Sequence, residues 1–182
     1  MTLAIEKVTA LSEELLADEA LVTGSLAGDR EAFGKLVRRY ERGVRATCWS
    51  VLRDHHLACD SGQDAFVEAY RGLSGLKDRR AFGGWVMTIA RRKALRASRS
   101  RRAEAALPEM RAPEPANGDG ELMEAVAKLP EQERVVVMLR FFDGREVGEI
   151  AVILGRPEGT VRKQLSRAYK RMRGEIMREM KR

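Results

Sequence analysis

Cysteine is scarce in this chain of 182 residues, which contains only Cys48 and Cys59. Two cysteines are too few for a disulfide scaffold and suit a reducing compartment. Long apolar runs are also missing, because the longest tract of large apolar side chains, Val135 to Leu139, is far too short to span a bilayer. The acidic N-terminus lacks the apolar core of a signal peptide. These absences predict a cytoplasmic protein with no membrane segment of its own.

Recognisable catalytic motifs are absent as well, and no glycine-rich loop of the P-loop type is present. His55, His56 and Cys59 lie close together and allow a metal or redox site as one interpretation. The fixed ligand spacings of zinc sites are missing, and a short pair of histidines is more often simply solvated. We therefore expect no enzymatic activity, no cofactor and no metal.

Aromatic residues make up only 5% of the chain, and this low aromatic content favours helices, while the 44% of residues that are apolar suffice to build cores. The chain carries 34 Lys and Arg against 27 Asp and Glu, a formal net charge of +7. Residues 79–103 contain Lys and Arg but no Asp or Glu, and residues 156–182 contain ten Lys and Arg against three Asp and Glu. Two separate basic segments predict two contacts with a polyanion such as nucleic acid.

Helical periodicity predicts two small all-helical domains joined by a flexible linker. Asp29 is expected to cap a long helix, and Asp60 with Gln63 to form a capping pair that opens the next one. Three of the five prolines and an Asn-Gly pair lie between residues 104 and 119, which predicts a linker there. The predicted divisions are an N-terminal extension at 1–17, a first domain at 18–103, the linker at 104–119 and a second domain at 120–182.

The stretch from Glu146 to Arg171 is typical of a helix-turn-helix. Its first helix has apolar residues at helical spacing, Gly155 suits the left-handed end of that helix, and Pro157 suits the start of the next. Apolar positions of the second helix form an inner face, at Val161, Leu165, Ala168 and Met172. Polar and basic residues form its outer face, at Thr160, Arg162, Lys163, Gln164, Ser166, Arg167 and Lys170. Such a face fits the DNA major groove, although many basic helix faces are only solvated.

Four segments, taken in order, resemble the extracytoplasmic-function (ECF) group of bacterial RNA polymerase sigma factors. The first two are AGDREAFGKLVRRYERGV and ACDSGQDAFVEAYRGL. The last two are AFGGWVMTIARRKAL and LPEQERVVVMLRFFDGREVGEIAVILGRPEGTVRKQLSRA. The resemblance covers about residues 18–102 and 120–175, with the proline-rich linker between.

The resemblance implies three partners: core RNA polymerase, promoter DNA and an anti-sigma factor. Core polymerase would be bound by Asp60, Gln63 and Asp64. The melted −10 promoter element would be held by Ser74, Gly75, Leu76, Lys77 and Asp78, with Arg92 and Arg96 touching it. The duplex −35 element would be bound by Thr160, Arg162, Lys163, Ser166, Arg167 and Lys170.

The chain departs from the family pattern at Cys59, where an acid is usual, and at Ser61 and Gly62, where apolar residues are usual. Arg92 and Arg96 replace residues that are often asparagine and aspartate. The departures at residues 59–62 leave open an altered contact with core polymerase. Because of Arg92 and Arg96, the −10 sequence preference of other family members should not be assigned to this chain. Two alternatives remain open: a stand-alone helix-turn-helix regulator, and a sigma-like decoy for an anti-sigma protein.

Overall fold

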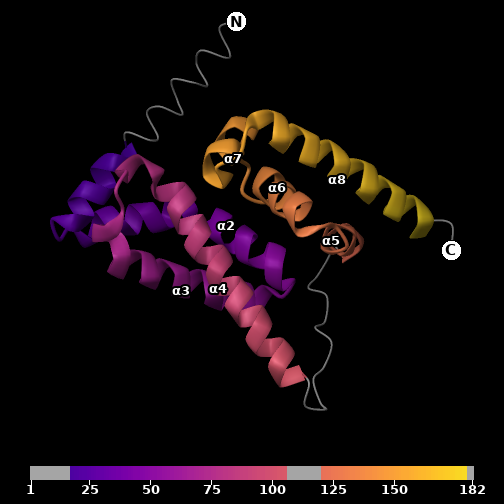
Figure 1. Ribbon diagram of the computed structural model, residues 1–182, viewed down its shortest axis with the longest axis horizontal. Coiled ribbons are helices and arrows are strands. Elements are labelled where there is room, and N and C mark those ends of the chain that lie inside the picture. Colours follow the sequence, from indigo (N-terminus) through magenta and orange to yellow (C-terminus); the bar gives the residue numbers. More distant parts are fainter. Residues whose placement is uncertain (1–16, 106–119, 180–182) are drawn as a thin grey trace, which may run out of the picture.

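The computed structural model describes residues 17–105 and 120–179, and every regular element in those ranges is helical (Figure 1). The all-helical prediction is therefore confirmed. The predicted extension and linker lie almost wholly outside the described residues, and α4 runs two residues into the predicted linker. The elements are a helix at residues 17–26, α2 (Arg30–Leu52), α3 (His55–Gly72), the 3₁₀ turns η1 (Leu73–Gly75) and η2 (Arg79–Ala81), α4 (Phe82–Ala105), α5 (Gly120–Ala127), α6 (Glu131–Phe141), α7 (Val147–Leu154) and α8 (Glu158–Glu179).

Helices α2, α3 and α4 pack against one another in pairs and form an N-terminal bundle, residues 17–105. Asp29 caps α2 as predicted, since its carboxylate accepts the backbone N–H groups of Glu31 and Ala32 at 2.9 and 3.1 Å. Helix α3 turns small residues toward α2, and a Cβ at Gly62 would lie 3.3 Å from Val44 Cγ1. Small residues therefore let the two helices approach closely.

The start of α3 differs from the prediction. The helix begins at His55, and Asp54 caps it by accepting the backbone N–H of Leu57 at 3.1 Å. Asp60 and Gln63 lie inside the helix and do not open it, because the α2–α3 turn already ends at Asp54. Tyr70, near the end of α3, is 46% exposed, and its ring packs edge to face with that of Phe33.

Helices α5 to α8 form a C-terminal bundle, residues 120–179. Helix α6 lies in its middle, with α8 on one side and α2 of the other bundle on the other side (Figure 1). Val136, Leu139, Ile150 and Val161 are fully buried there.

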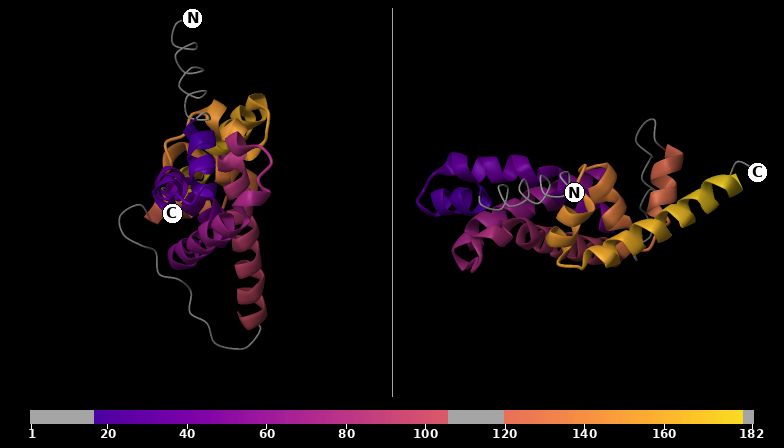
Figure 2. Two further views of the ribbon diagram at one scale, coloured as in Figure 1. Left: turned by 90° about the vertical axis from the view of Figure 1, so that its left-hand side faces the viewer. Right: turned by 90° about the horizontal axis from the view of Figure 1, so that it is seen from above.

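The two bundles pack directly on each other, as the two views of Figure 2 show. Helix α2 contacts α6, α4 contacts α7, and the buried apolar side chains of both bundles form one continuous core. Arg134 of α6 donates to the backbone carbonyl of Ser50 in α2. The sequence predicted two domains on a tether but gave no sign of this bundle interface.

Candidate nucleic-acid interface

The turn between α7 and α8 follows from its glycine. Gly155 has φ 60° and lies at the C-cap of α7, in the left-handed region where a side chain would be strained. The backbone N–H of Arg156 then closes on Ala151 O at 2.9 Å, and α8 begins after Pro157. Val161, Leu165 and Ala168 of α8 are buried, so the predicted register of the helix is confirmed.

The opposite face of α8 is exposed and basic. Gln164 is an exception to the prediction, because it is buried and accepts a hydrogen bond from Arg156 Nη1 at 3.2 Å. Within α8, Glu158 pairs with Arg162 at 2.9 Å, one turn apart. The i,i+4 spacing of that pair is a sequence signal that the prediction did not use. The predicted contact residues that are exposed together on this face are Thr160, Arg162, Lys163, Ser166, Arg167 and Lys170.

A second exposed surface runs along α3. Asp60, Gln63 and Asp64 are all exposed, and Val67 lies one turn further on with 48% of its surface exposed. Spacings of three and four residues bring these side chains to one side of the helix. The surface combines carboxylates, an amide and an apolar side chain, which is a composition suited to another protein and not to DNA.

The departures at residues 59 to 62 affect this surface less than their number suggests. Ser61 and Gly62 are both buried, and Gly62 lies against α2, so these two residues affect helix packing and not the exposed face. Cys59 is half-buried, with its Sγ 3.8 Å from His55 Nε2. Within the described residues, no group of three or more His, Cys, Asp or Glu side chains is arranged to hold a metal ion.

The two cysteines are expected to differ sharply in reactivity. Burial, reinforced by the nearby Cys59, raises the pKa of the fully buried Cys48 thiol to about 12. Because the thiolate is the nucleophile, N-ethylmaleimide at neutral pH should modify only Cys59 in the native protein. Mass spectrometry should find the second adduct only after denaturant is added. Rapid double labelling of native protein would contradict the burial of Cys48.

The loop between α3 and α4 forms a third surface. Ser74, Gly75, Lys77 and Asp78 are exposed, whereas Leu76 packs partly against the core. The loop is short and shaped by its own contacts. Asp78 accepts the backbone N–H of Arg80 at 3.1 Å, and Arg79 donates to Thr23 Oγ1 at 2.8 Å. A groove of about 420 Å³ lies beside it, between Leu76, Trp85 and the end of α7.

The basic helix α4 exposes Arg92 and Arg96, as predicted. The structure adds Glu68 of α3, which pairs with Arg92 and with Lys93, the latter at 3.0 Å. The hydrogen bond from Lys93 and the charges of Arg92 and Lys93 hold the pKa of Glu68 below its ordinary value. Sequence reasoning missed Glu68, because it lies 24 positions from Arg92 and only the packing of α3 on α4 brings them together.

Glu68→Gln should therefore free Arg92 for phosphate. We expect affinity for single-stranded DNA to rise about two- to fivefold, and its salt slope to steepen by up to about one unit, because one more cation is available to displace counterions. Fluorescence anisotropy over a salt series measures both. Glu31→Gln is the matched control, since it removes the same charge from a surface pair with Lys35. Equal gains in both variants would mean that only net charge matters.

These features are typical of a helix-turn-helix protein that binds nucleic acid. Family comparison agrees. Residues 36–104 match the model of Sigma-70 region 2, and residues 119–172 match the model of Sigma-70, region 4. The first match covers most of the N-terminal bundle, and the second covers most of the C-terminal bundle.

Two curated relatives are similar over about nine tenths of their own length. The chain is 32% identical to the ECF RNA polymerase sigma-E factor of Escherichia coli K12 over 176 residues, covering 85% of this chain and 92% of the relative. It is 30% identical to the RNA polymerase sigma-H factor of Pseudomonas aeruginosa over 172 residues, covering 83% of this chain and 89% of the relative. The chain belongs to the ECF sigma factors, which are transcription regulators and not enzymes.

Solved structures support the fold. One is CnrH in complex with the cytosolic domain of CnrY, with a TM-score of 0.65 and 24% identity, covering 88% of this chain and 97% of that one. Another is the sigma factor RpoE with the anti-sigma factor NepR from Bartonella quintana, with a TM-score of 0.59, 23% identity and coverage of 80% and 96%. In the part of this chain that the structure describes, no helix is long and apolar enough to cross a membrane.

Proposed function

We propose that this protein is a specificity subunit that directs core RNA polymerase to promoters and helps to open them. The N-terminal domain, residues 18–103, binds core polymerase through Asp60, Gln63 and Asp64. Its loop at residues 74–78 holds a base of the melted −10 element, with Arg92 and Arg96 on the adjacent strand. The C-terminal domain, residues 120–182, binds the −35 duplex through α8.

The exposed face of α8 carries the proposal. Six polar or basic side chains project from a helix whose other face is fixed by Val161, Leu165 and Ala168, and the preceding turn is that of a helix-turn-helix. A helix held in this way can present its N-terminal half to base edges in the major groove. The exposed acidic and amide surface of α3 supports a separate protein contact, which a stand-alone regulator would not need.

Reconstitution tests this function. The protein should co-purify with core RNA polymerase, and the mixture should initiate transcription at defined sites that sequencing of transcript starts would reveal. Binding to core without any transcription would favour a decoy for an anti-sigma protein. DNA binding without association with core would favour a stand-alone regulator.

Gln63 gives a clean test of the core contact. It is exposed within α3 and caps nothing, and alanine is the better helix former, so Gln63→Ala should not lower the melting temperature. We expect weaker binding to core polymerase, by roughly tenfold if the amide makes a buried hydrogen bond in the complex. Glu41→Ala, exposed on α2, is the control. Unchanged core affinity in the Gln63 variant would remove this residue from the interface.

An anti-sigma protein is the proposed negative partner. The structures similar to this chain include that of the sigma factor RpoE in complex with the anti-sigma factor NepR. A pull-down with the full-length chain as bait, eluted and identified by mass spectrometry, would test this in the source cell. Competition of the captured protein with core polymerase is the expected result.

A further inference from the structure

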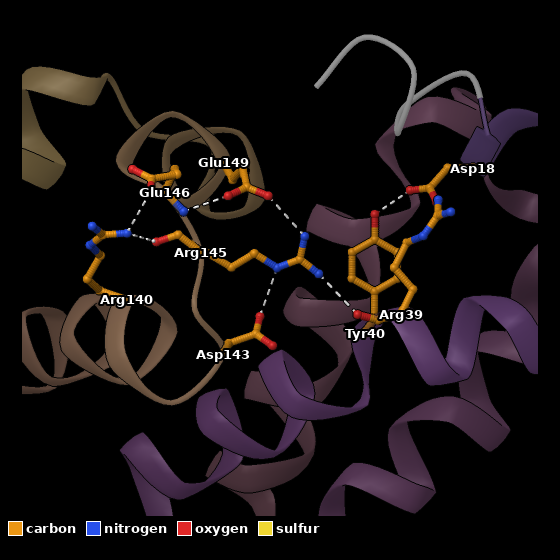
Figure 3. A network of polar contacts seen from close by, with 8 residues as sticks. All are labelled: Asp18, Arg39, Tyr40, Arg140, Asp143, Arg145, Glu146 and Glu149. Carbon is orange, nitrogen blue, oxygen red and sulfur yellow. Dashed lines mark hydrogen bonds and ion pairs between the residues drawn. The ribbon is translucent and has the colours of Figure 1, made fainter. Parts of the chain in front are cut away.

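The helix at residues 17–26 is anchored on α2 by a buried carboxylate. Asp18 is fully buried and accepts hydrogen bonds from Arg39 Nη1 at 2.5 Å and from the hydroxyl group of Tyr40 (Figure 3). Val22, one turn further along the same helix, is also fully buried. Because a buried charge is costly unless it is paired and hydrogen-bonded, these contacts fix Asp18 and the helix that carries it.

Tyr40 joins this anchor to the end of the loop between α3 and α4. Its ring packs against that of Phe82, with the ring centres 5.6 Å apart, and a Cβ on Gly83 would lie 2.7 Å from Tyr40 Cε1. Phe82 and Gly83 are the first residues of α4. The residue that bonds Asp18 therefore also fixes the place where the loop ends.

The helix at residues 17–26 also contacts the loop directly, through Thr23. Arg79 Nη1 donates to Thr23 Oγ1 at 2.8 Å, across 56 positions of the chain. The Thr23 hydroxyl itself donates to the backbone oxygen of Glu19, one turn earlier, at 2.7 Å. Because a hydroxyl has a single hydrogen, that bond turns the lone pairs of Oγ1 toward Arg79. The helix therefore holds the arginine side chain in one orientation.

Arg79 lines an open pocket of about 550 Å³ beside the loop, together with Glu19, Lys77, Asp78 and Arg80. The cations outnumber the acids, and Asp78 is already paired with Arg80 Nε at 3.2 Å. Among the described residues Arg79 forms no ion pair, so the N–H groups that Thr23 does not use are available to an anion. Lys77 and Asp78 also line the groove where the base of the melted strand is proposed to lie.

We propose that this pocket binds a backbone phosphate of the melted DNA strand, and that Thr23 is the positioning residue that orients Arg79 for it. The inference rests on the proposed function, because it adds a phosphate subsite next to the base held by the loop. A guanidinium presents its N–H donors in a rigid plane that matches a phosphate. An arginine that is ordered before binding loses less side-chain freedom when the phosphate arrives, so affinity is higher.

Substitutions in the helix and in the loop test the two parts of this inference. Thr23→Val keeps the shape of the side chain and removes the hydroxyl, whereas Thr23→Ser retains the hydroxyl and should rescue binding. Ser25→Ala is the matched control, because Ser25 Oγ donates to the backbone oxygen of Leu21 at 2.7 Å but forms no hydrogen bond with the loop among the described residues. Arg79→Ala removes the cation itself. Circular dichroism establishes that each variant is folded.

Fluorescence anisotropy of the full chain with a short labelled single-stranded DNA of random sequence, over a salt series, gives the affinity and its salt slope. We expect Arg79→Ala to weaken binding about three- to tenfold and to lower the salt slope by about 0.7 unit, the value for one phosphate contact on a single strand. Thr23→Val should weaken binding about two- to fivefold with the slope unchanged, because the cation is still present but must be ordered on binding. Thr23→Ser and Ser25→Ala should match the wild type.

The double variant Thr23→Val/Arg79→Ala separates positioning from a general effect on the helix. It should bind no more weakly than Arg79→Ala alone, because Thr23 acts only through Arg79. Additive losses, an equal loss in Ser25→Ala, or unchanged binding in either single variant would overturn the inference. Equal losses on duplex DNA of the same length would overturn the assignment to the melted strand.

A separate measurement distinguishes these failures from failure of the proposed function. The wild type is mixed with core polymerase and assayed for co-purification and transcription. If it binds core and initiates transcription while the variants behave as one of the contrary outcomes above, only the inference fails. If it binds neither core nor single-stranded DNA, the proposed function fails and the inference with it.

Discussion

Phe82→Ala is expected to lower the free energy of unfolding by about 3–5 kcal/mol, because the vacated volume cannot be refilled by its neighbours. Phe82 is fully buried at the start of α4, and its ring packs against those of Phe33, Tyr40 and Trp85. Those rings come from α2 and α4, so the loss should loosen the whole N-terminal bundle. Chemical denaturation followed by circular dichroism gives the change.

Phe141→Ala is the control for that measurement. Phe141 is 58% exposed at the end of α6 and contacts only the edge of the Tyr169 ring among the aromatic side chains described. Its removal should cost less than about 1 kcal/mol, since surface substitutions seldom cost more. Equal losses in the two variants would mean that Phe82 does not occupy the centre of the N-terminal core.

The second large effect concerns how α8 reads sequence. Arg162→Ala or Arg167→Ala should cost about 1–3 kcal/mol of binding to the preferred −35 sequence and relax preference at one position. Lys170→Ala, further along the helix, should weaken all sequences alike and lower the salt slope by about one unit. The two classes differ because the N-terminal half of a recognition helix reaches base edges, while residues further along the helix contact phosphates.

Binding selections on randomised −35 sequences would separate the two classes. Glu158→Gln is the needed control, because Arg162→Ala also removes the ion pair with Glu158. That variant should leave sequence preference unchanged if Arg162 itself reads a base. If all variants lose affinity with no change in sequence preference, α8 contacts only the DNA backbone. Promoter choice would then rest on the N-terminal domain.

Local patterns predicted the helix-turn-helix well. The spacing of Val161, Leu165 and Ala168 fixed the buried face of α8, and Gly155 marked the end of α7, since both signals are contained in a few consecutive residues. Gln164 was placed on the wrong face because a polar residue on the boundary of the buried stripe can be drawn inward by partners. Here Arg156 and Gln132 supply them.

Contacts between residues far apart in the sequence could not be predicted from local patterns. Arg145 bonds the backbone of Arg39 across 106 positions, and no periodicity connects them. The capping error at Asp60 had a different cause. Asp60 stands three residues before Gln63, the spacing of a capping pair, but the left-handed Arg53 ends α2 earlier, so the next helix begins directly after Asp54. The exposed contact residues were predicted from resemblance, and their roles remain predictions.

Arg53 joins backbone shape to the packing of the bundles. It is the one residue other than glycine with positive φ in the part of the chain that the structure describes, at 54°. Glycine would remove a cost of about 1–2 kcal/mol there. The arginine side chain, however, donates from Nη1 to the backbone oxygen of Ala127 in α5 at 3.3 Å. Arg53→Gly, introduced to raise thermal stability, would also remove this hydrogen bond between the bundles. At this position, backbone conformation favours glycine, whereas the contact between the bundles favours arginine.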